Sequence, residues 1–143
     1  MSDNMKTATV VWKEGLVFEG AADGVKVNLD SPTGATGFSP MGLLLVSLAG
    51  CTGMDVIDIL RKKRQDVTGL EIQVSGTRAE THPRKYTAIR VHYVVTGHNI
   101  DPEAVRRSIE LSETKYCSVS ATVSPAAPIT TDFEIREAEL AAA

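Results

Sequence analysis

The two cysteines, Cys51 and Cys117, are the first candidates for chemistry in this chain of 143 residues. A thiolate attacks peroxides and disulfides, whereas a free cysteine on an apolar face is usually an inert core residue. Cys51 shares one face of a helical pattern with Leu44, Leu48 and Asp55, and that face is mostly apolar. The cysteines belong to different elements, so any pairing between them would be tertiary and is left open by their spacing.

Cys117 lies where one helical pattern ends and a shorter one begins. Backbone N–H groups at such a helix start would point at its sulfur and lower the pKa of the thiol. Two acidic residues, Asp55 and Asp58, follow Cys51 in the helical pattern, and Asp55 is near enough to touch a thiol. We expect both carboxylates instead to pair with lysine or arginine at a subunit surface.

Residues that could bind metals, nucleotides or nucleic acids lack the spacing that these ligands require. His82, His92 and His98 form no CxxC or HxxxH pattern, and His92 falls on the polar face of a strand. The GATG segment at residues 34–37 has neither GxGxxG nor the context of a dinucleotide-binding turn. The basic cluster at residues 61–64 complements a helix C-terminus, and the net charge of -3 would not attract polyanions. We therefore expect no cofactor, no metal and no nucleic acid partner.

The composition is that of a soluble folded protein, with 43% hydrophobic and 23% charged residues. This length predicts one domain over residues 1–143. The longest apolar stretch, residues 41–51, is interrupted by Gly42, Ser47 and Gly50 and is shorter than the roughly 20 residues of a membrane-spanning helix. The N-terminus has no secretory signal pattern. We expect no membrane partner, a cytoplasmic location and reduced cysteines.

A long helix is the main element that must position Cys51. Ser39 as N-cap and Pro40 at the first helical position predict its start, and the helical pattern continues to about Arg64. Such a helix would be about 35 Å long, which is more than a domain of this size covers alone. We therefore expect a partner subunit against this helix, with Leu48 at the interface.

The other elements occur in groups rather than in strict alternation. A second helix begins at Asp101 and carries Val105, Ile109, Ser112 and Tyr116 on one face. Alternating hydrophobicity predicts three short strands before the long helix, at residues 8–12, 16–18 and 25–29, and three after it, at 70–74, 89–95 and 129–135. The strands at 70–74 and 89–95 are expected to form a hairpin that turns near His82-Pro83. Grouped strands predict an α+β fold with largely antiparallel pairing.

Two segments that contain the cysteines resemble one family. SPMGLLLVSLAGCTGMDVIDILRKKRQ at residues 39–65 and YCSVSATV at residues 116–123 resemble the OsmC/Ohr family, and its YhfA-like branch in particular. The resemblance covers nearly the whole chain. It implies an α+β fold with antiparallel sheets packed on a long central helix, in an intertwined homodimer with active sites at the interface. It also implies thiol-dependent reduction of hydroperoxides.

The resemblance gives each cysteine a role. It places the attack on peroxide at Cys51 and the resolution of the resulting sulfenic acid, as a disulfide, at Cys117. The apolar helix face around Cys51 would suit an organic hydroperoxide better than hydrogen peroxide. Family behaviour also suggests a dithiol, such as a lipoylated protein, as the reductant.

The chain departs from the peroxidase pattern beside Cys51. Ohr enzymes have a glutamate after the proline that begins the central helix, where this chain has Met41 after Pro40. They also have an arginine in the early strand region, but the first 51 residues contain no arginine. Without this pair an apolar pocket does not favour a thiolate. An alternative is therefore a non-catalytic protein that binds an apolar small ligand in the dimer-interface cavity, and a third is a structural dimer with inert thiols.

Overall fold

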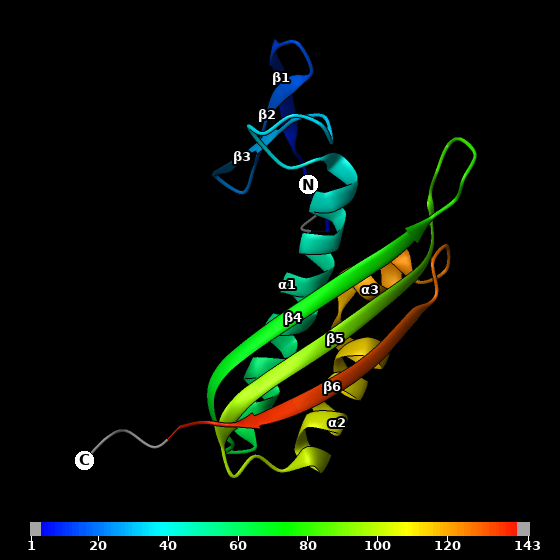
Figure 1. Cartoon of the computed structure of the whole chain (residues 1–143). Coiled ribbons are helices and arrows are strands. Elements are labelled where there is room, and N and C mark those ends of the chain that lie inside the picture. Colours follow the sequence, from blue (N-terminus) through cyan, green and yellow to red (C-terminus); the bar gives the residue numbers. More distant parts are fainter. Residues whose placement is uncertain (1–3, 140–143) are drawn as a thin grey trace. The chain divides into compact units, whose positions relative to one another are not determined.

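The computed structural model describes residues 4–139, which form two compact units, one up to Leu44 and one from Leu45 (Figure 1). Each unit is described by itself below. The prediction of one domain over residues 1–143 stays a prediction.

The first unit contains a three-stranded antiparallel sheet, as predicted. Its strands are β1 (Thr9–Glu14), β2 (Val17–Ala22) and β3 (Val25–Leu29), in the order β1-β2-β3. The turns between them use Gly15 at φ 52° and Gly24 at φ 78°, in the left-handed region that glycine tolerates without steric cost.

The loop after β3 is organised around Asp30, which is 8% exposed. Its carboxylate accepts hydrogen bonds from the Ser31 amide at 2.7 Å and the Thr36 hydroxyl at 2.5 Å. The hydrogen bond from Thr36, followed by that from Ser31, lowers the pKa of Asp30. A Cβ on Gly34 would lie 2.2 Å from an Asp30 carboxylate oxygen, so this close approach requires glycine.

Helix α1 (Pro40–Lys62) begins where the sequence predicts and ends two residues before the expected Arg64. The Ser39 hydroxyl accepts the Gly42 N–H at 3.1 Å, as an N-cap does. A single stripe of the helix is buried in this chain, at Leu48, Thr52, Val56 and Leu60. The expectation that Leu48 lies at a dimer interface is wrong, because Leu48 is 1% exposed and packs inside its own chain.

Helix α1 is long and apolar enough, by length and composition, to cross a membrane. A core helix of a soluble protein has the same properties, so this is weak evidence for a membrane segment. The interruption by glycine and serine therefore does not by itself exclude a membrane span, and the lack of a membrane partner stays a prediction.

The second unit contains a sheet of strands β4 (Asp66–Arg78), β5 (Tyr86–His98) and β6 (Ile129–Glu137), in that order. Strands β4 and β5 form the predicted antiparallel hairpin, with Ile72 opposite Tyr93. Strand β6 pairs in parallel with β5, which departs from the antiparallel pattern of the other pairs. The chain crosses over through helices between β5 and β6, and a crossover of this kind returns the chain in the same direction.

The crossover consists of α2 (Pro102–Leu111), the π-helix η1 (Ser112–Tyr116) and α3 (Ser118–Val123). Asp101 caps α2 by accepting the Glu103 N–H at 3.0 Å. The expected face is buried at Val105, Ile109 and Ser112. Tyr116, expected on this face, is 51% exposed, because the π-helix interrupts the period of 3.6 residues.

In Figure 1 the helices lie on one side of the β4-β5-β6 sheet. The core of the second unit lies between these helices and the sheet. The buried apolar residues come from α1, from the central strand β5 and from α2: Leu48, Val56, Leu60, Val91, Tyr93, Val95, Val105 and Ile109. The middle of α1 is thereby held against β5 and the crossover.

Candidate active site

The structure brings Cys51 and Cys117 together. Cys51 is half-buried in the middle of α1, and Cys117 is 3% exposed at the junction of η1 and α3. Both are free thiols, and Cys51 is near enough to Cys117 to raise the pKa of its thiol. The packing of α1 against the crossover therefore places the two sulfurs near each other. The spacing in the sequence leaves this proximity open.

Burial controls the acidity of the Cys117 thiol. The Ser120 amide points at its sulfur at 3.3 Å, as the sequence predicts for a helix start. Even so, the pKa of Cys117 is raised, because desolvation outweighs the hydrogen bonds from Ser120 that favour the thiolate. The neighbouring Cys51 raises this pKa further. The expectation of a lowered pKa is thus wrong in its net direction.

A buried chain of hydroxyl groups fastens α1 beside the cysteines. The Thr52 hydroxyl hydrogen-bonds to the Tyr93 hydroxyl at 2.7 Å and to the Ser112 hydroxyl at 2.8 Å. Ser112 in turn donates to the Asp55 carboxylate at 3.0 Å. Thr52 and Ser112 are fully buried, and so is Tyr93, whose pKa is raised by burial. These bonds tie α1 to β5 and η1 one residue away from Cys51.

Glu113 is the acidic residue of this cluster that contacts Ser120. Its Oε1 atom is 3.5 Å from the Ser120 hydroxyl, and its carboxyl group also hydrogen-bonds to Tyr93. Desolvation raises the pKa of Glu113 despite these hydrogen bonds. Ser120 therefore contacts both the carboxyl group of Glu113 and the sulfur of Cys117.

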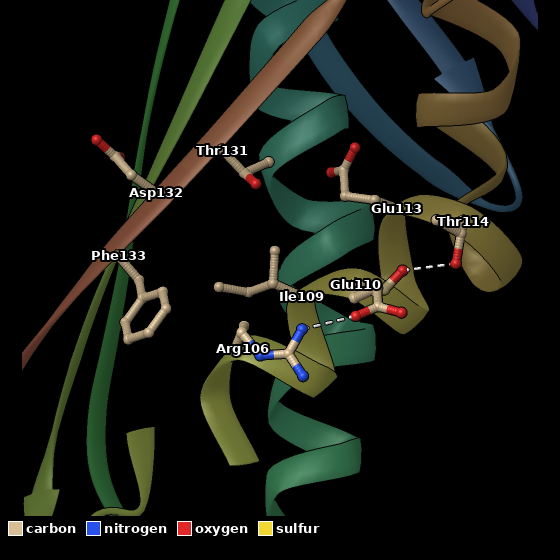
Figure 2. Close-up of a pocket in the computed structure, with 8 residues that line it drawn as sticks. All are labelled: Arg106, Ile109, Glu110, Glu113, Thr114, Thr131, Asp132 and Phe133. Carbon is tan, nitrogen blue, oxygen red and sulfur yellow. Dashed lines mark hydrogen bonds and ion pairs between the residues drawn. The ribbon is translucent and has the colours of Figure 1, made fainter. Parts of the chain in front are cut away.

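A cavity of about 480 Å³ opens beside this cluster, between the α2–η1 segment and β6 (Figure 2). Its apolar walls are Ile109 and Phe133, and Glu113 is on its rim. The other lining residues are polar or charged: Arg106, Glu110, Thr114, Thr131 and Asp132. Glu113 thus belongs both to the cavity and to the hydrogen-bonded group around the thiols.

Comparison with known proteins identifies the family. The family model for OsmC-like protein matches residues 32–132. The chain belongs to the OsmC-like family. It is 40% identical over 129 residues to Protein YhfA of Escherichia coli (strain K12), a match that covers 90% of this chain and 96% of YhfA. The resemblance to the OsmC/Ohr family and its YhfA-like branch is therefore confirmed.

Solved structures of OsmC-like proteins confirm the fold class. A hypothetical protein from Aquifex aeolicus VF5 has a TM-score of 0.87 at 32% identity, and the match covers 95% of this chain and 99% of that one. The organic hydroperoxide resistance protein OhrB of Bacillus subtilis has a TM-score of 0.62 at 20% identity, over 91% and 98% of the two chains. Some members of the OsmC/Ohr family are thus hydroperoxide resistance proteins by name.

The two acidic residues that follow Cys51 in this OsmC-like protein have partners other than the thiols. Asp55 accepts a hydrogen bond from Ser112 within this chain, and its expected pairing with lysine or arginine at a subunit surface stays a prediction. Asp58 pairs with Lys62 at 2.9 Å, as expected of a surface carboxylate. No group of three or more histidine, cysteine or acidic residues that could hold a metal ion occurs within residues 4–139. The absence of a metal stays a prediction.

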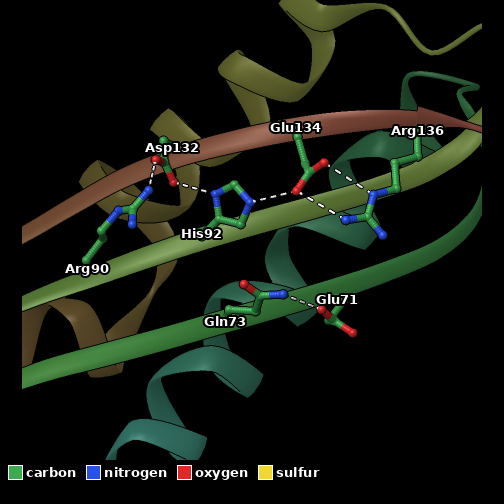
Figure 3. Close-up of polar contacts among 7 residues, drawn as sticks. All are labelled: Glu71, Gln73, Arg90, His92, Asp132, Glu134 and Arg136. Carbon is green, nitrogen blue, oxygen red and sulfur yellow. Dashed lines mark hydrogen bonds and ion pairs between the residues drawn. The ribbon is translucent and has the colours of Figure 1, made fainter.

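His92 lies on the polar face of β5, as its position in the alternating pattern predicts (Figure 3). Its Nδ1 atom is 2.6 Å from Asp132, and its Nε2 atom is 3.0 Å from Glu134. The hydrogen bond to Glu134, followed by that to Asp132, raises the pKa of His92. This arrangement belongs to the outer face of the sheet and not to the thiol pair.

The sequence did not single out Thr52, Tyr93, Glu113 or Ser120. The signals that could have found them are weak: a tyrosine on an otherwise apolar strand face needs a partner for its hydroxyl, and Glu113 and Ser120 lie four residues before and three residues after Cys117. These residues become functional candidates because the crossover places them beside the cysteines. A local sequence pattern does not show that placement.

Proposed function

We propose that this OsmC-like protein is a thiol peroxidase that reduces organic hydroperoxides with Cys51 and Cys117. The observation that carries the proposal is the neighbouring pair of free thiols on α1 and at the start of α3. A nucleophilic thiol needs a second thiol at contact distance if its sulfenic acid is to be captured before further oxidation. The name of the Bacillus subtilis structural neighbour, a hydroperoxide resistance protein, agrees with this chemistry.

The difference in exposure supports one distribution of the two roles. Cys51 is the more exposed thiol and attacks the peroxide, whereas Cys117, at 3% exposure, is shielded from it. The Cys51 sulfur bonds to the terminal peroxide oxygen, the O–O bond breaks, and the alcohol leaves with a proton. The Cys117 sulfur then bonds to the Cys51 sulfur and water leaves. A dithiol, such as a lipoylated protein, returns both cysteines to thiols by two exchange steps and is itself oxidised to a disulfide.

The environment of Cys117 suits the second role. Burial raises its pKa, so this thiol remains protonated until the sulfenic acid forms beside it. A resolving thiol that stays protonated does not compete with Cys51 for peroxide, since only a thiolate is strongly nucleophilic.

The experiment uses cumene hydroperoxide and mass spectrometry. The wild-type protein should form a Cys51–Cys117 disulfide with little higher oxidation. Cys117→Ser should accumulate a sulfenic acid at Cys51 that dimedone traps, and then sulfinic acid. Cys51→Ser should lose turnover with a dithiol reductant. Consumption of peroxide no faster than by free cysteine in all three proteins would overturn the proposal.

The alternative function is non-catalytic binding of an apolar small ligand. The cavity beside Ile109 and Phe133 favours it, because about 480 Å³ is within the size range of small-molecule sites. Binding of cumyl alcohol, the stable reduced product, to a protein that does not turn over peroxide would support this function. The same binding by an active enzyme would make the cavity a substrate site.

We also propose that two chains associate as a homodimer. Several large apolar side chains are exposed on the single chain, including Trp12 at 62%, Val25 at 67% and Met54 at 74%. Exposed apolar surface of this kind is buried when a second copy covers it. Light scattering should report twice the chain mass of 15.3 kDa, and Met54→Asp should shift the protein toward the monomer. A folded wild-type monomer at micromolar concentration would refute the association.

A further inference from the structure

Glu113 and Cys117 share one hydrogen-bond partner, Ser120. The Ser120 amide is 3.3 Å from the Cys117 sulfur. Both the amide and the hydroxyl of Ser120 act to lower the pKa of that thiol. The same hydroxyl is 3.5 Å from Glu113 Oε1. A proton that leaves the Cys117 sulfur therefore has one hydroxyl group between it and a carboxyl oxygen.

Burial decides which form of Glu113 is favoured. The Ser120 hydroxyl donates to the Oε1 atom of Glu113, and Tyr93 also acts to favour the carboxylate. Desolvation outweighs both and raises the pKa of Glu113, so this half-buried carboxyl group holds a proton more readily than an exposed glutamate does.

The position of Glu113 on the cavity gives this proton a route to solvent. The cavity is open and about 480 Å³ in volume, and Glu113 lines it together with Thr131 and Asp132 (Figure 2). A carboxyl group that is half-buried beside a thiol and reaches an open cavity can accept a proton on one side and release it on the other. Its raised pKa makes it a stronger base than an exposed glutamate.

We propose that Glu113 accepts the proton of the Cys117 thiol through the Ser120 hydroxyl in the step that forms the disulfide. The inference rests on the proposed two-cysteine function. In this step Ser120 gives its hydrogen to the Glu113 carboxylate and takes the hydrogen of the Cys117 thiol. The Cys117 sulfur bonds to the Cys51 sulfur, the S–O bond of the sulfenic acid breaks, and hydroxide leaves and takes a proton from solvent to become water. Glu113 then releases its proton through the cavity.

The working form for this step is the carboxylate, so disulfide formation should accelerate as pH rises through the pKa of Glu113. The ionisable groups around it come from every neighbouring element: Cys51 and Asp55 on α1, Tyr93 on β5, Arg106 and Glu110 on α2, Cys117 before α3, and Asp132 on β6. Arg106 is engaged by Glu103 and Glu110, and Asp132 by Arg90 and His92.

Glu113→Gln is the appropriate variant, because glutamine has the shape of the protonated carboxyl group. Its side-chain oxygen can accept from Ser120 as Glu113 does, and its size keeps the packing of η1. It cannot accept the proton. Ser120→Ala removes the hydroxyl link but leaves the backbone amide that contacts the sulfur. Glu71→Gln, in an exposed glutamate of β4 that bonds to Gln73, is the matched control.

Two single-turnover assays measure the step. With one equivalent of cumene hydroperoxide, the decay of the dimedone-reactive sulfenic acid is followed from about pH 5 to pH 9. With the aromatic disulfide DTNB, Cys51 first forms a mixed disulfide, and Cys117 then displaces the second thiolate without any peroxide. Glu113→Gln and Ser120→Ala should slow both sulfenic acid decay and second-thiolate release roughly 100-fold. Both variants should also lose the rise in rate with pH on the acid side of the profile. Glu71→Gln should match the wild type.

The first step of each assay separates this inference from the proposed function. The attack on cumene hydroperoxide and the first thiolate release should be the same in Glu113→Gln and the wild type. If the wild type forms no sulfenic acid, the peroxidase function fails, and the DTNB assay still tests Glu113. Second-thiolate release by Glu113→Gln at the wild-type rate and with the wild-type pH profile would overturn the inference.

Discussion

Replacement of Thr52 by valine tests whether the buried hydroxyl chain holds α1 in place. Thr52 is 0% exposed, and its hydroxyl forms hydrogen bonds of 2.7 Å to Tyr93 and 2.8 Å to Ser112. Valine has nearly the same shape, so the variant creates no cavity and the loss is confined to these two bonds. Each buried hydrogen bond contributes about 1 kcal/mol net to the free energy of unfolding.

The partners of Thr52 keep the expected cost near this sum. Ser112 retains Asp55, and Tyr93 retains Glu113, so neither hydroxyl is left without a partner. We therefore expect Thr52→Val to lower the free energy of unfolding by about 2 kcal/mol, and Tm by roughly 4–8 °C for a chain of this length.

Urea unfolding followed by far-ultraviolet circular dichroism is the appropriate assay for Thr52→Val. The fluorescence of the one tryptophan, Trp12, reports on the other unit. The protein concentration must be fixed, because association would stabilise the folded chain. Thr68→Val, at an exposed hydroxyl of β4, is the matched control and should change stability by less than about 0.5 kcal/mol.

Two outcomes of the Thr52→Val experiment would refute the reasoning. A loss below about 0.5 kcal/mol would mean that the two hydrogen bonds do not hold α1. A loss above about 4 kcal/mol would mean that a buried hydroxyl has been left unpaired, and hence that Tyr93 and Glu113 are not partners. A double-mutant cycle with Tyr93→Phe should give a coupling energy of about 1 kcal/mol.

Two further variants test the outer face of the sheet and the loop before α1. The raised pKa of His92 means that its ion pairs stabilise the fold fully below the ordinary pKa of 6.5, and that this stabilisation is lost as pH rises through the folded-state pKa. The urea midpoint of the wild type should therefore fall between about pH 6 and pH 9. His92→Gln should reduce that fall. An unchanged pH profile would refute this contribution. Gly34→Ala places a Cβ 2.2 Å from Asp30 and should displace its carboxylate from Thr36, at a cost of roughly 1–3 kcal/mol measured by Trp12 fluorescence in urea. Unchanged stability would mean that the Asp30 loop adapts freely.

The features predicted well from the sequence are those that local chemistry determines. Ser39 and Asp101 cap helices because a short polar side chain before a helix satisfies free N–H groups, whatever the rest of the fold does. Alternation placed the strands and put His92 on a polar face because side chains of a strand point to opposite sides. Cys51 and Cys117 are identified by residue type and by the sequence motifs around them.

The features that the sequence did not predict depend on packing between distant segments. The parallel pairing of β6 follows from the crossover, and alternation within β6 is the same for either direction. The pKa of Cys117 was predicted in the wrong direction because its helix start was visible in the sequence, whereas its burial was not. Glu113 reads as an ordinary polar helix residue until Tyr93 and Ser120 are placed beside it.

The π-helix η1 connects these separate observations. The Cys117 amide bonds to the Ser112 carbonyl, five residues back, where an α-helix would use the carbonyl of Glu113. The extra residue in this turn changes the direction of the residues that follow by about 100° about the helix axis. Ser112 can therefore remain on the buried face with Thr52 while Cys117 leaves the helix beside Cys51 and caps α3. A regular helix would satisfy the backbone equally well, so the π turn is explained by the positions of Ser112, Glu113 and Cys117 rather than by the hydrogen bonds of the helix.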